Sequence, residues 1–310
     1  VALFEKGRIA GEQSSRNWGW IRQQGRDWAE LPIMMEANRI WQNLEKWTGD
    51  SDLAFTQSGC FYLAEDQSSM HKFEEWHELA KQHQLDTKLL TAQQVKQQFP
   101  DLTGTFYGGM VTVTDGRGEP FVAVPALARA AQKLGVSVIE ECAVRTLYME
   151  AGEVAGVNTE RGLVRCSQAV LATGAWSTYF AHNAGFSLPQ LAVRSTAART
   201  EPTEKILSPN LSLPGLALRR RADGGYTCAS ADLAEHYLSV GSFKYFTKFF
   251  QLLRAAAKDI KIYPSAPTSY PGAWGSPRRW NADDISPFEK MRVLNPPPSP
   301  LAIKLSLIHI

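Results

Sequence analysis

The sequence predicts an α/β fold that is α+β in part, and three observations indicate this class. The apolar run that opens residues 1–5 predicts a buried strand. An alanine-rich helical pattern over 120–134 leads into a strand pattern at 136–140. Short alternating segments between residues 144 and 166 then predict a three-stranded β-meander. A helix and a strand that feed a meander are typical of an α/β organisation with a β excursion.

The remaining elements follow from residue spacing and turn residues. Apolar side chains at helical spacing predict helices over 31–48, 68–85 and 243–261. Thr91 and Gln94 form a capping-box pair that predicts the start of another short helix. Strands are expected over 191–200 and 216–230, and a hairpin over 54–63. A further buried strand is expected over 168–172, ending in the glycine turn at 173–176.

The composition describes a soluble globular protein with one large domain or two ordinary ones. Of 310 residues, 44% are hydrophobic and 21% are charged. The net charge of +2 gives no reason to expect nucleic acid or an anionic membrane as a partner. Membrane association is not indicated, because no stretch reaches the roughly 18 apolar residues of a membrane span. We expect a cytoplasmic protein, and since the chain begins at Val1, an upstream signal sequence stays open.

The sequence predicts no metal site. The cysteines lie far apart and form no CxxC pair. His71, His77 and His83 follow one another at six-residue intervals, whereas helical metal pairs stand four residues apart. A solvated helix face explains these histidines more simply.

Two N-terminal features indicate a nucleotide ligand. Glu5 ends a strand, where a dinucleotide-binding unit carries the acid that binds a ribose about 20 residues after a glycine-rich turn. No such turn occurs in the sequence, so it would lie before residue 1, and a solvated glutamate is the alternative. The loop GEQSSRNWGW at 11–20 offers hydroxyls, an arginine, two tryptophans and Gly19 to a large, anionic, aromatic ligand. The alternative is a loop whose tryptophans only pack.

Four segments together resemble a known family. In order they are LFEKG, GEQSSRNWGW, GEPFVAVPALARAAQKLGVSV and VLATGAWS. This set resembles the FAD-dependent amine and amino-acid oxidoreductases of the D-amino-acid oxidase superfamily, among them glycine oxidase, sarcosine oxidase and D-amino-acid dehydrogenase. The similarity runs from residue 1 to about 200 and is weaker over 201–304.

The resemblance implies a Rossmann-like FAD-binding domain interwoven with a mixed-sheet substrate domain. Residues 1–50 and 110–192 would form the FAD-binding domain, with its first βα unit missing. Residues 51–109 and 193–304 would form the substrate domain. Apart from the family resemblance, LSLIHI at 305–310 follows a proline-rich stretch and is expected to be a non-native tail, with a genuine apolar tail as the alternative. The family's C-terminal flavin segment, which in several members supplies an arginine for the substrate carboxylate, does not occur before residue 310.

The resemblance also implies cofactor-binding roles. Glu5 would bind the adenosine ribose, and Ser14 and Ser15 would meet the pyrophosphate. Along the flavin ring would lie the loop residues Asn17, Trp18, Gly19 and Trp20. Val144 would offer its backbone N–H and C=O to adenine. The residues that would close over the cofactor are Thr173, Gly174 and Trp176.

The implied activity is FAD-dependent oxidation of a C–N bond in an amino acid or secondary amine. A hydride would pass to the flavin, and the imine product would hydrolyse. The partner is a small-molecule amine or amino acid; the sequence names neither the electron acceptor nor a catalytic residue. Two alternatives are an inactive fragment unable to hold FAD and an NAD-dependent dehydrogenase. The run Arg219-Arg220-Arg221 offers a cation to an acidic substrate, or forms a solvated strand edge, the commoner case.

Overall fold

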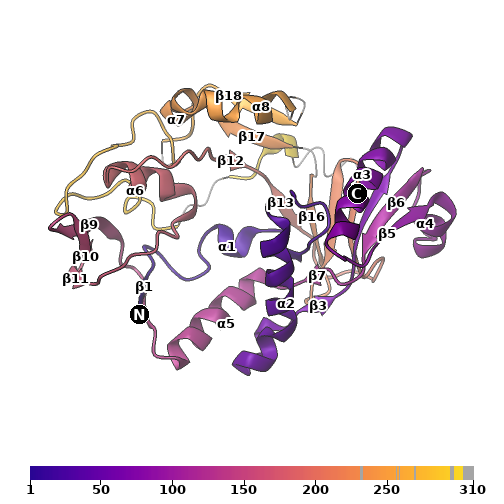
Figure 1. The fold of residues 1–310 in the computed structure, drawn as a ribbon, viewed down its shortest axis with the longest axis horizontal. Helices are drawn as coiled ribbons and strands as arrows, with labels where there is room; N and C mark the ends of the chain where they lie inside the picture. Colours follow the sequence, from indigo (N-terminus) through magenta and orange to yellow (C-terminus); the bar gives the residue numbers. More distant parts are fainter. Residues whose placement is uncertain (231–232, 256, 258, 269, 294–296, 303–310) are drawn as a thin grey trace. The chain divides into compact units, whose positions relative to one another are not determined.

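The computed structural model describes residues 1–230, 233–255, 257, 259–268, 270–293 and 297–302. These residues form two compact units (Figure 1). Unit 1 comprises Val1–Ser15, Ala131–Ser195 and Leu233–Pro297. Unit 2 comprises Arg16–Ala130, Thr196–Asp232 and Pro298–Ile310. The tail expected at 305–310 lies outside the described residues.

The two units divide the chain differently from the interwoven domains expected from the family resemblance. Residues 16–50 and 110–130 were assigned to the FAD-binding domain and fall in unit 2. Residues 233–297 were assigned to the substrate domain and fall in unit 1. The segments 1–15 and 131–192 of the expected FAD-binding domain do belong to unit 1.

Unit 1 contains the predicted strand–meander arrangement. Strand β1 (Ala2–Phe4) pairs in parallel with β8 (Ser137–Ile139), so that Leu3 lies opposite Val138. The meander is confirmed as an antiparallel three-stranded sheet of β9 (Val144–Glu150), β10 (Glu153–Thr159) and β11 (Gly162–Arg165). Its second turn needs Gly162, whose φ of 111° is rarely adopted by other residues.

The rest of unit 1 is built from short elements. A 3₁₀ turn, η2 (Gly174–Trp176), leads into α6 (Ser177–Asn183). Three strands form a second small sheet: β12 (Val193–Arg194), β17 (Ala234–Tyr237) and β18 (Ile260–Tyr263). Helices α7 (Val240–Lys244) and α8 (Phe246–Ala255) follow β17. The helix predicted over 243–261 is wrong in extent, because Ile260–Tyr263 alternates apolar and basic residues and pairs in parallel with β17.

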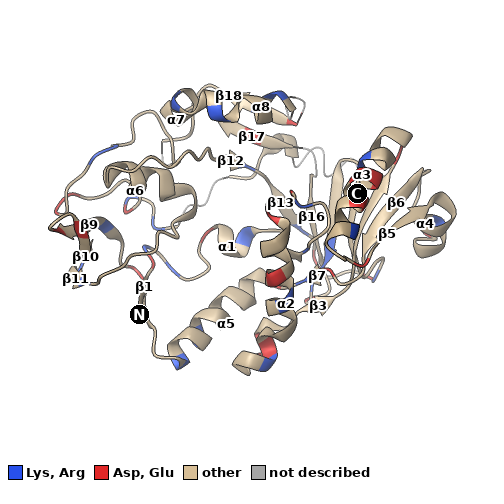
Figure 2. Ribbon diagram, viewed as in Figure 1, with Lys and Arg blue, Asp and Glu red and all other residues tan. Residues whose placement is uncertain are grey.

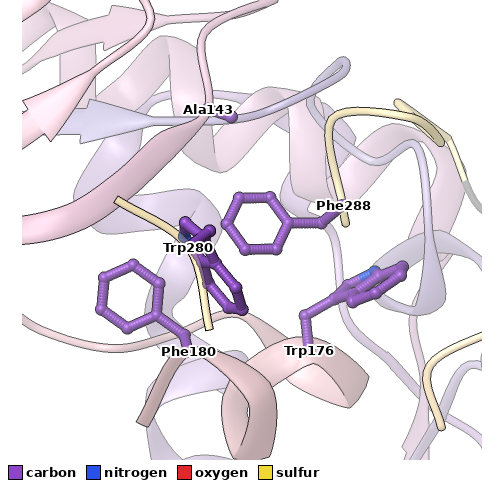
Figure 3. Close-up of a cluster of buried hydrophobic side chains, with 5 residues drawn as sticks. All are labelled: Ala143, Trp176, Phe180, Trp280 and Phe288. Carbon is purple, nitrogen blue, oxygen red and sulfur yellow. The ribbon is translucent and has the colours of Figure 1, made fainter. Parts of the chain in front are cut away.

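The largest aromatic cluster of unit 1 joins the meander to α6. Its buried members are Ala143, Trp176, Phe180, Trp280 and Phe288 (Figure 3). The ring of Phe288 stands edge-on to both tryptophans, with centroids 6.0 Å from Trp176 and 5.6 Å from Trp280. Trp280 also donates its Nε1–H to the Arg145 carbonyl at 2.7 Å. Buried aromatic pairs of this kind contribute strongly to packing, so the cluster stabilises the meander against α6.

Unit 2 is organised around a mixed seven-stranded sheet of order β13-β16-β15-β14-β4-β6-β5. The strands are β13 (Ala197–Arg199), β16 (Tyr226–Ala229), β15 (Leu216–Arg220), β14 (Asn210–Leu213), β4 (Cys60–Ala64), β6 (Gly108–Thr112) and β5 (Thr87–Thr91). Only the β14–β4 pair is parallel among these described strands. Helices α3 (Gln67–Gln82) and α4 (Ala92–Gln98) contact β5 and β6. The α4 capping box of Thr91 and Gln94 is confirmed.

A smaller sheet and two long helices complete unit 2. The sheet has the order β2 (Trp20–Ile21), β7 (Gly116–Arg117), β3 (Thr56–Gln57). Helix α2 (Leu31–Thr48) packs through Trp41 and Leu44 against η1 (Ser51–Leu53) and α5 (Pro120–Lys133). The hairpin predicted over 54–63 is wrong, because β3 pairs with β7 while β4 lies between β14 and β6.

Two predicted buried strands are not buried. Residues 168–172 form no strand, and the side chain of Val170 is 93% exposed. Strand β1 does form, yet Leu3 is 41% exposed. An apolar run becomes a buried strand only when neighbours cover it on both sides. Among the described strands β1 has one neighbour, β8, and residues 168–172 have none.

Acidic and basic side chains are distributed over both units (Figure 2). Within the described residues, no helix combines the length and apolarity that crossing a bilayer demands.

Candidate functional site

Glu5 lies at the carboxyl end of parallel strand β1, within unit 1. Its backbone continues the pairing with β8: Glu5 N–H donates to the Ile139 carbonyl at 2.9 Å, and its carbonyl accepts from Cys142 N–H at 3.0 Å. Its side-chain Oε1 accepts from the Gly7 N–H at 2.8 Å. Burial raises the pKa of this half-buried carboxyl. Glu5 is therefore a fixed acceptor at a strand end, the position of a ribose-binding acid.

The turn after β1 is clamped by residues 291–293. Lys6 Nζ donates to the carbonyls of Met291 and Arg292, both at 2.9 Å, and pairs with Glu12. Arg292 Nη1 donates back to the Lys6 carbonyl at 2.9 Å. A Cβ on Gly7 would stand 2.2 Å from the Arg292 carbonyl oxygen, so only glycine fits there. These contacts hold Glu5 and its neighbours in one conformation.

The serine pair of the N-terminal loop lies at α1 (Gln13–Arg16). Ser14 is exposed, whereas Ser15 is buried. The Ser15 hydroxyl donates to the Ala10 carbonyl. This bond fixes the loop and uses the hydroxyl hydrogen of Ser15. Ser14 is the serine that lies at the surface of unit 1.

The loop from Asn17 to Trp20 lies in unit 2 and depends on glycine. Asn17 Oδ1 accepts from the Gly19 N–H at 2.8 Å, and the Gly19 carbonyl accepts from the Gly118 N–H at 3.0 Å. Gly19 has φ +72°, and an added Cβ would lie 2.7 Å from the Gly118 oxygen and 2.8 Å from the Arg219 guanidinium carbon. The rings of Trp18 and Trp20 meet edge-on at 5.8 Å. Glycine thus brings backbone against a buried cation, beside two aromatic rings.

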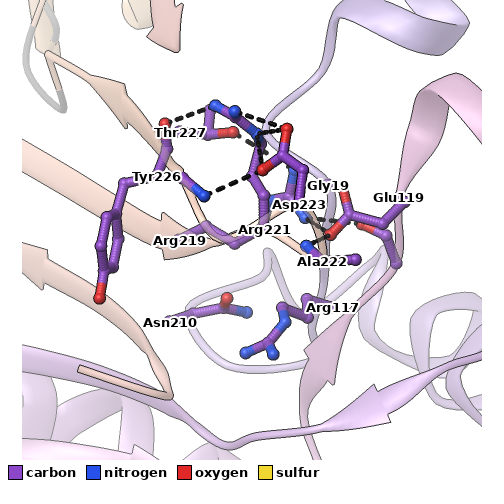
Figure 4. A network of polar contacts seen from close by, with 12 residues as sticks. Gly19, Arg117, Glu119, Asn210, Arg219, Arg221, Ala222, Asp223, Tyr226 and Thr227 are labelled. Atoms are coloured by element: carbon purple, nitrogen blue, oxygen red, sulfur yellow. Dashed lines mark hydrogen bonds and ion pairs between the residues drawn. The ribbon is translucent and has the colours of Figure 1, made fainter. Parts of the chain in front are cut away.

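Arg219 is a buried cation of unit 2 (Figure 4). Its side chain is 1% exposed. Nη1 donates to the Gly118 carbonyl at 2.9 Å and to Glu119 Oε1 at 2.7 Å, and Nη2 donates to Thr227 Oγ1 at 3.3 Å. Buried Nε has no hydrogen-bond partner among the described residues. An unpartnered N–H on a buried charge is costly, so it marks a place where a ligand would supply an acceptor.

The solvated strand edge expected at Arg219-Arg220-Arg221 is wrong for two of the three arginines. Arg219 and Arg221 are buried. Arg219 lies on β15, between β14 and β16 in the seven-stranded sheet, and Arg221 directly follows that strand and donates to the carbonyls of Tyr226 and Thr200. Arg221 is neutralised by Asp223, with Nη2 2.7 Å from Oδ2. Arg220 points its guanidinium to the carbonyls of Thr203 and Glu204. Of the three, Arg219 alone has a side-chain N–H that is buried without a partner in the part of the chain described.

Asp115 is a buried carboxylate that sequence reasoning missed. Its oxygens accept from the backbone N–H of Gln23 at 2.8 Å and of Gln24 at 3.0 Å. The side chains of Gln23 and Asn38 also donate to Oδ1. Burial outweighs these donors and raises the pKa of Asp115 to about 6. Asp115 thereby positions the segment that follows Trp20. In the sequence, the only indication of a buried carboxylate was an acid close to the end of the apolar run of β6.

The remaining predicted cofactor residues belong to unit 1. Val144 opens β9 and packs against the aromatic cluster that contains Trp176. Thr173 Oγ1 lies 3.0 Å from Ser177 Oγ, and the Gly174 carbonyl accepts from Gln190 at 3.1 Å. Trp176 is 3% exposed, and its buried Nε1–H has no partner among the described residues. Unit 1 thus holds Glu5, the serine pair, Val144 and residues 173–176, and unit 2 holds Asn17–Trp20.

An acid at the carboxyl end of a parallel strand is typical of dinucleotide-binding proteins. Comparison with known proteins identifies the family. The family described as FAD dependent oxidoreductase matches residues 1–284, and the chain belongs to it. The cofactor of this family is FAD. The alternative of an NAD-dependent dehydrogenase is therefore set aside.

Three relatives illustrate the similarity. Sarcosine oxidase subunit beta from Arthrobacter is 30% identical over 196 residues, which are 61% of this chain and 48% of that protein. The match to the structure of L-amino acid deaminase from Proteus vulgaris covers all of this chain and 72% of the deaminase chain, with 26% identity and a TM-score of 0.90. The match to the Proteus myxofaciens enzyme, solved in complex with anthranilate, covers 94% of this chain and 66% of the enzyme chain, with 27% identity and a TM-score of 0.86. The chain spans about half the length of the Arthrobacter protein, 48%, and 23% of the length of the mitochondrial sarcosine dehydrogenase from Mus musculus.

The residues present fit part of an FAD site. Glu5 offers a fixed carboxylate acceptor for a ribose, and the orphaned Nε1–H of Trp176 offers a buried donor in the same unit. In unit 2 the loop at Gly19 excludes any side chain, as close approach of a flat ring to backbone requires. These residues would hold the cofactor, which when bound supplies the redox chemistry.

Proposed function

We propose that this protein oxidises the C–N bond of an amino acid or N-alkylated amino acid, passing a hydride to FAD. The substrate then becomes an imine, which hydrolyses in water to a carbonyl compound and the amine. The family supports oxidoreductase chemistry, and relatives named for sarcosine and L-amino acids support the substrate class. The unpartnered Nε–H of buried Arg219 is the observation in this chain that carries the proposal.

Arg219 is suited to bind the substrate carboxylate. Its positive charge is opposed by one carboxylate, Glu119, which is itself 21% exposed and also accepts from the Ala222 N–H at 3.0 Å. A guanidinium recognises a carboxylate best through two parallel N–H groups. Nε and the adjacent Nη would supply these without moving Arg219 from the Gly118 carbonyl. In a water-poor site this interaction is stronger than in solution, so it would orient the substrate.

Steady-state kinetics with an artificial electron acceptor and added FAD test this role. We expect Arg219→Lys to raise the KM for an amino acid by roughly 100-fold, because lysine cannot form the bidentate pair. Arg220→Lys, at the next position on β15, is the matched control. Because Arg220 binds two backbone carbonyls, this variant should leave the KM within about twofold of the parent value. An amine without a carboxylate should lose little in either variant. Equal losses for both substrates would show that Arg219 has only a structural role.

A chain that does not hold FAD is the second candidate. The exposed segment at 168–172 and the single neighbour of β1 favour it, since a cofactor-binding sheet normally covers such strands. Visible absorption of the purified protein after gel filtration decides between the two. Bound flavin would exclude this candidate, whereas a colourless protein that is folded and monomeric would support it.

A further inference from the structure

Unit 1 contains a pocket of about 110 Å³ that the redox chemistry does not use. It is lined by residues of α6, β12, β17 and α7, together with the turn at 270–272 (elements labelled in Figure 1). Every lining residue belongs to unit 1, whereas Arg219 belongs to unit 2. The pocket thus shares no lining residue with the contacts of Arg219.

Tyr270 gives this pocket an unused hydrogen-bond donor. The side chain is 8% exposed, and its buried hydroxyl has no hydrogen-bond partner among the residues described. Burial raises the pKa of Tyr270, and the neighbouring Arg194 guanidinium acts in the opposite direction. Because a guanidinium can only donate, the O–H of Tyr270 is still available to a ligand acceptor. Its ring meets that of Tyr237 edge-on at 5.4 Å, which holds it in place. A buried hydroxyl without a partner costs free energy that a ligand acceptor would recover.

The charged groups that line the pocket are basic, and none of its described lining residues is acidic. Two of the basic groups are already engaged. Arg194 pairs with buried Glu235, with Nε 2.6 Å from Oε2. Both ring nitrogens of His236 lie 2.9 Å from oxygens, those of the Ala192 carbonyl and the Ser242 hydroxyl.

Two exposed cations of the lining remain available, Lys244 and Arg278. In the described part of the chain neither pairs with a carboxylate. His182, the other lining imidazole, has its Nδ1 3.3 Å from the Arg278 carbonyl. The pocket therefore favours an anion over a cation or a neutral molecule of the same shape.

The size and walls of the pocket limit the body of the ligand. Its remaining walls are tyrosine rings and the apolar residues Leu191, Val193, Val240 and Pro271. A cavity of about 150 Å³ holds one benzene molecule, and drug-sized ligands need about 300 Å³ or more. A volume of 110 Å³ is smaller than that, so the pocket encloses a short branched chain or part of one ring whose remainder stays at the open side.

We propose that this pocket binds a small monocarboxylate with an apolar body, such as a benzoate-sized acid. The Tyr270 hydroxyl would donate to a carboxylate oxygen, Lys244 and Arg278 would neutralise the charge, and the tyrosine rings would cover the apolar body. The inference does not depend on the proposed oxidation, because the proposed ligand contacts, Tyr270, Lys244 and Arg278, take no part in it.

Calorimetric titration with benzoate tests the site, with benzamide as the neutral probe of equal shape. We expect saturable binding of benzoate and at least tenfold weaker binding of benzamide. Tyr270→Phe should weaken benzoate about tenfold, since it removes the donor and leaves the ring. Lys244→Ala should weaken it several-fold, whereas Lys248→Ala, in the following helix and outside the lining, should leave it unchanged.

Arg219→Lys separates this site from the proposed substrate site. Binding that survives in Arg219→Lys and is lost in Tyr270→Phe supports the inference. Binding that shows the opposite pattern, equal binding of benzamide, or no saturation would overturn it. Thermal unfolding of Tyr270→Phe without ligand checks the fold: removal of an unpartnered buried hydroxyl should leave the midpoint unchanged or higher.

Discussion

Two arrangements of cations, one in each unit, differ in burial and in the partners of their donors. In unit 1 the cations of the clamp around Glu5 have several acceptors each: Lys6 binds Glu12 and two carbonyls, and Arg292 binds Glu160 and the Lys6 carbonyl. In unit 2 Arg219 is more deeply buried, yet its Nε has no partner among the described residues. The first arrangement holds a backbone turn, whereas the second has an N–H group that a ligand oxygen could accept from.

The difference shows how a buried charge reports its role. A charge placed for stability is surrounded by acceptors, because each unsatisfied donor costs about 1–3 kcal/mol. A charge placed for a ligand is left incomplete, and the ligand completes it. Burial alone therefore does not distinguish a structural arginine from a binding arginine; the count of its satisfied donors does.

Removal of each arginine gives the largest expected contrast. Arg219→Ala should lower kcat/KM for an amino acid by at least about 100-fold, because it removes the carboxylate partner. Arg292→Ala should cost about 1–3 kcal/mol of unfolding free energy with little change in KM, because its donors bind the Lys6 carbonyl and the Glu160 carboxylate. Kinetics and urea unfolding of both variants check this. Equal effects of the two variants on KM would remove the distinction between the sites.

The glycine beside Arg219 offers a sharper test of close approach. Gly19 and Gly49 have similar positive φ angles, +72° and +67°. A Cβ added at Gly19 would meet Gly118 and Arg219, whereas a Cβ added at Gly49 would meet nothing within 4 Å. Gly49→Ala should cost about 1 kcal/mol for its backbone conformation alone. Gly19→Ala should cost roughly 2 kcal/mol more, since backbone atoms must move. Urea unfolding measures both; equal losses would mean that the loop is free to shift.

Asp115 and Glu160 should respond to pH in opposite directions. Asp115 has a folded pKa of about 6, above its ordinary 3.8, so its contribution is complete below pH 3.8 and is lost as pH rises through 6. The loss amounts to about 2–3 kcal/mol across that window. Asp115→Asn should flatten the unfolding free energy between pH 4 and pH 6, roughly, as measured by denaturant titration. An unchanged slope would show that the carboxylate is ionised throughout.

Glu160 supplies the opposite case and the smallest expected effect. The Arg292 guanidinium lowers the pKa of Glu160 to about 2 from its ordinary 4.5, so its contribution is complete above pH 4.5 and is lost as pH falls towards 2. Because Arg292 is 36% exposed, solvent screening reduces this contribution to about 1 kcal/mol. Glu160→Gln should therefore be less stable than the parent at pH 7 and equal to it near pH 2.5, roughly, by the same titration.

Local features of the fold could be predicted from the sequence because their causes lie within a few residues. The meander follows from alternation and from a glycine at its second turn, and the start of α4 follows from Thr91 and Gln94. The failures all involve distant partners. Residues 54–63 look like a hairpin, but β3 and β4 find different neighbours; residues 168–172 look buried, but no described strand covers them.

The candidate site divides in the same way. Glu5 at a strand end and Gly19 in a tight loop could be named from their own segments, although the part each would play toward FAD remains a prediction. Asp115 and the orphaned Nε of Arg219 could not be found this way. Their properties depend on donors from Gln23, Gln24, Gly118 and Thr227, which only the folded chain brings near.

The sequence by itself determined the fold class, the family resemblance and the elements whose turns and caps are local. The tertiary structure decided which apolar runs are covered, which arginines of the 219–221 run are buried, and which donors remain unpaired. The reason is physical. Turn and cap preferences act between residues a few positions apart, whereas burial and the satisfaction of a buried charge depend on atoms that meet only when distant segments pack together.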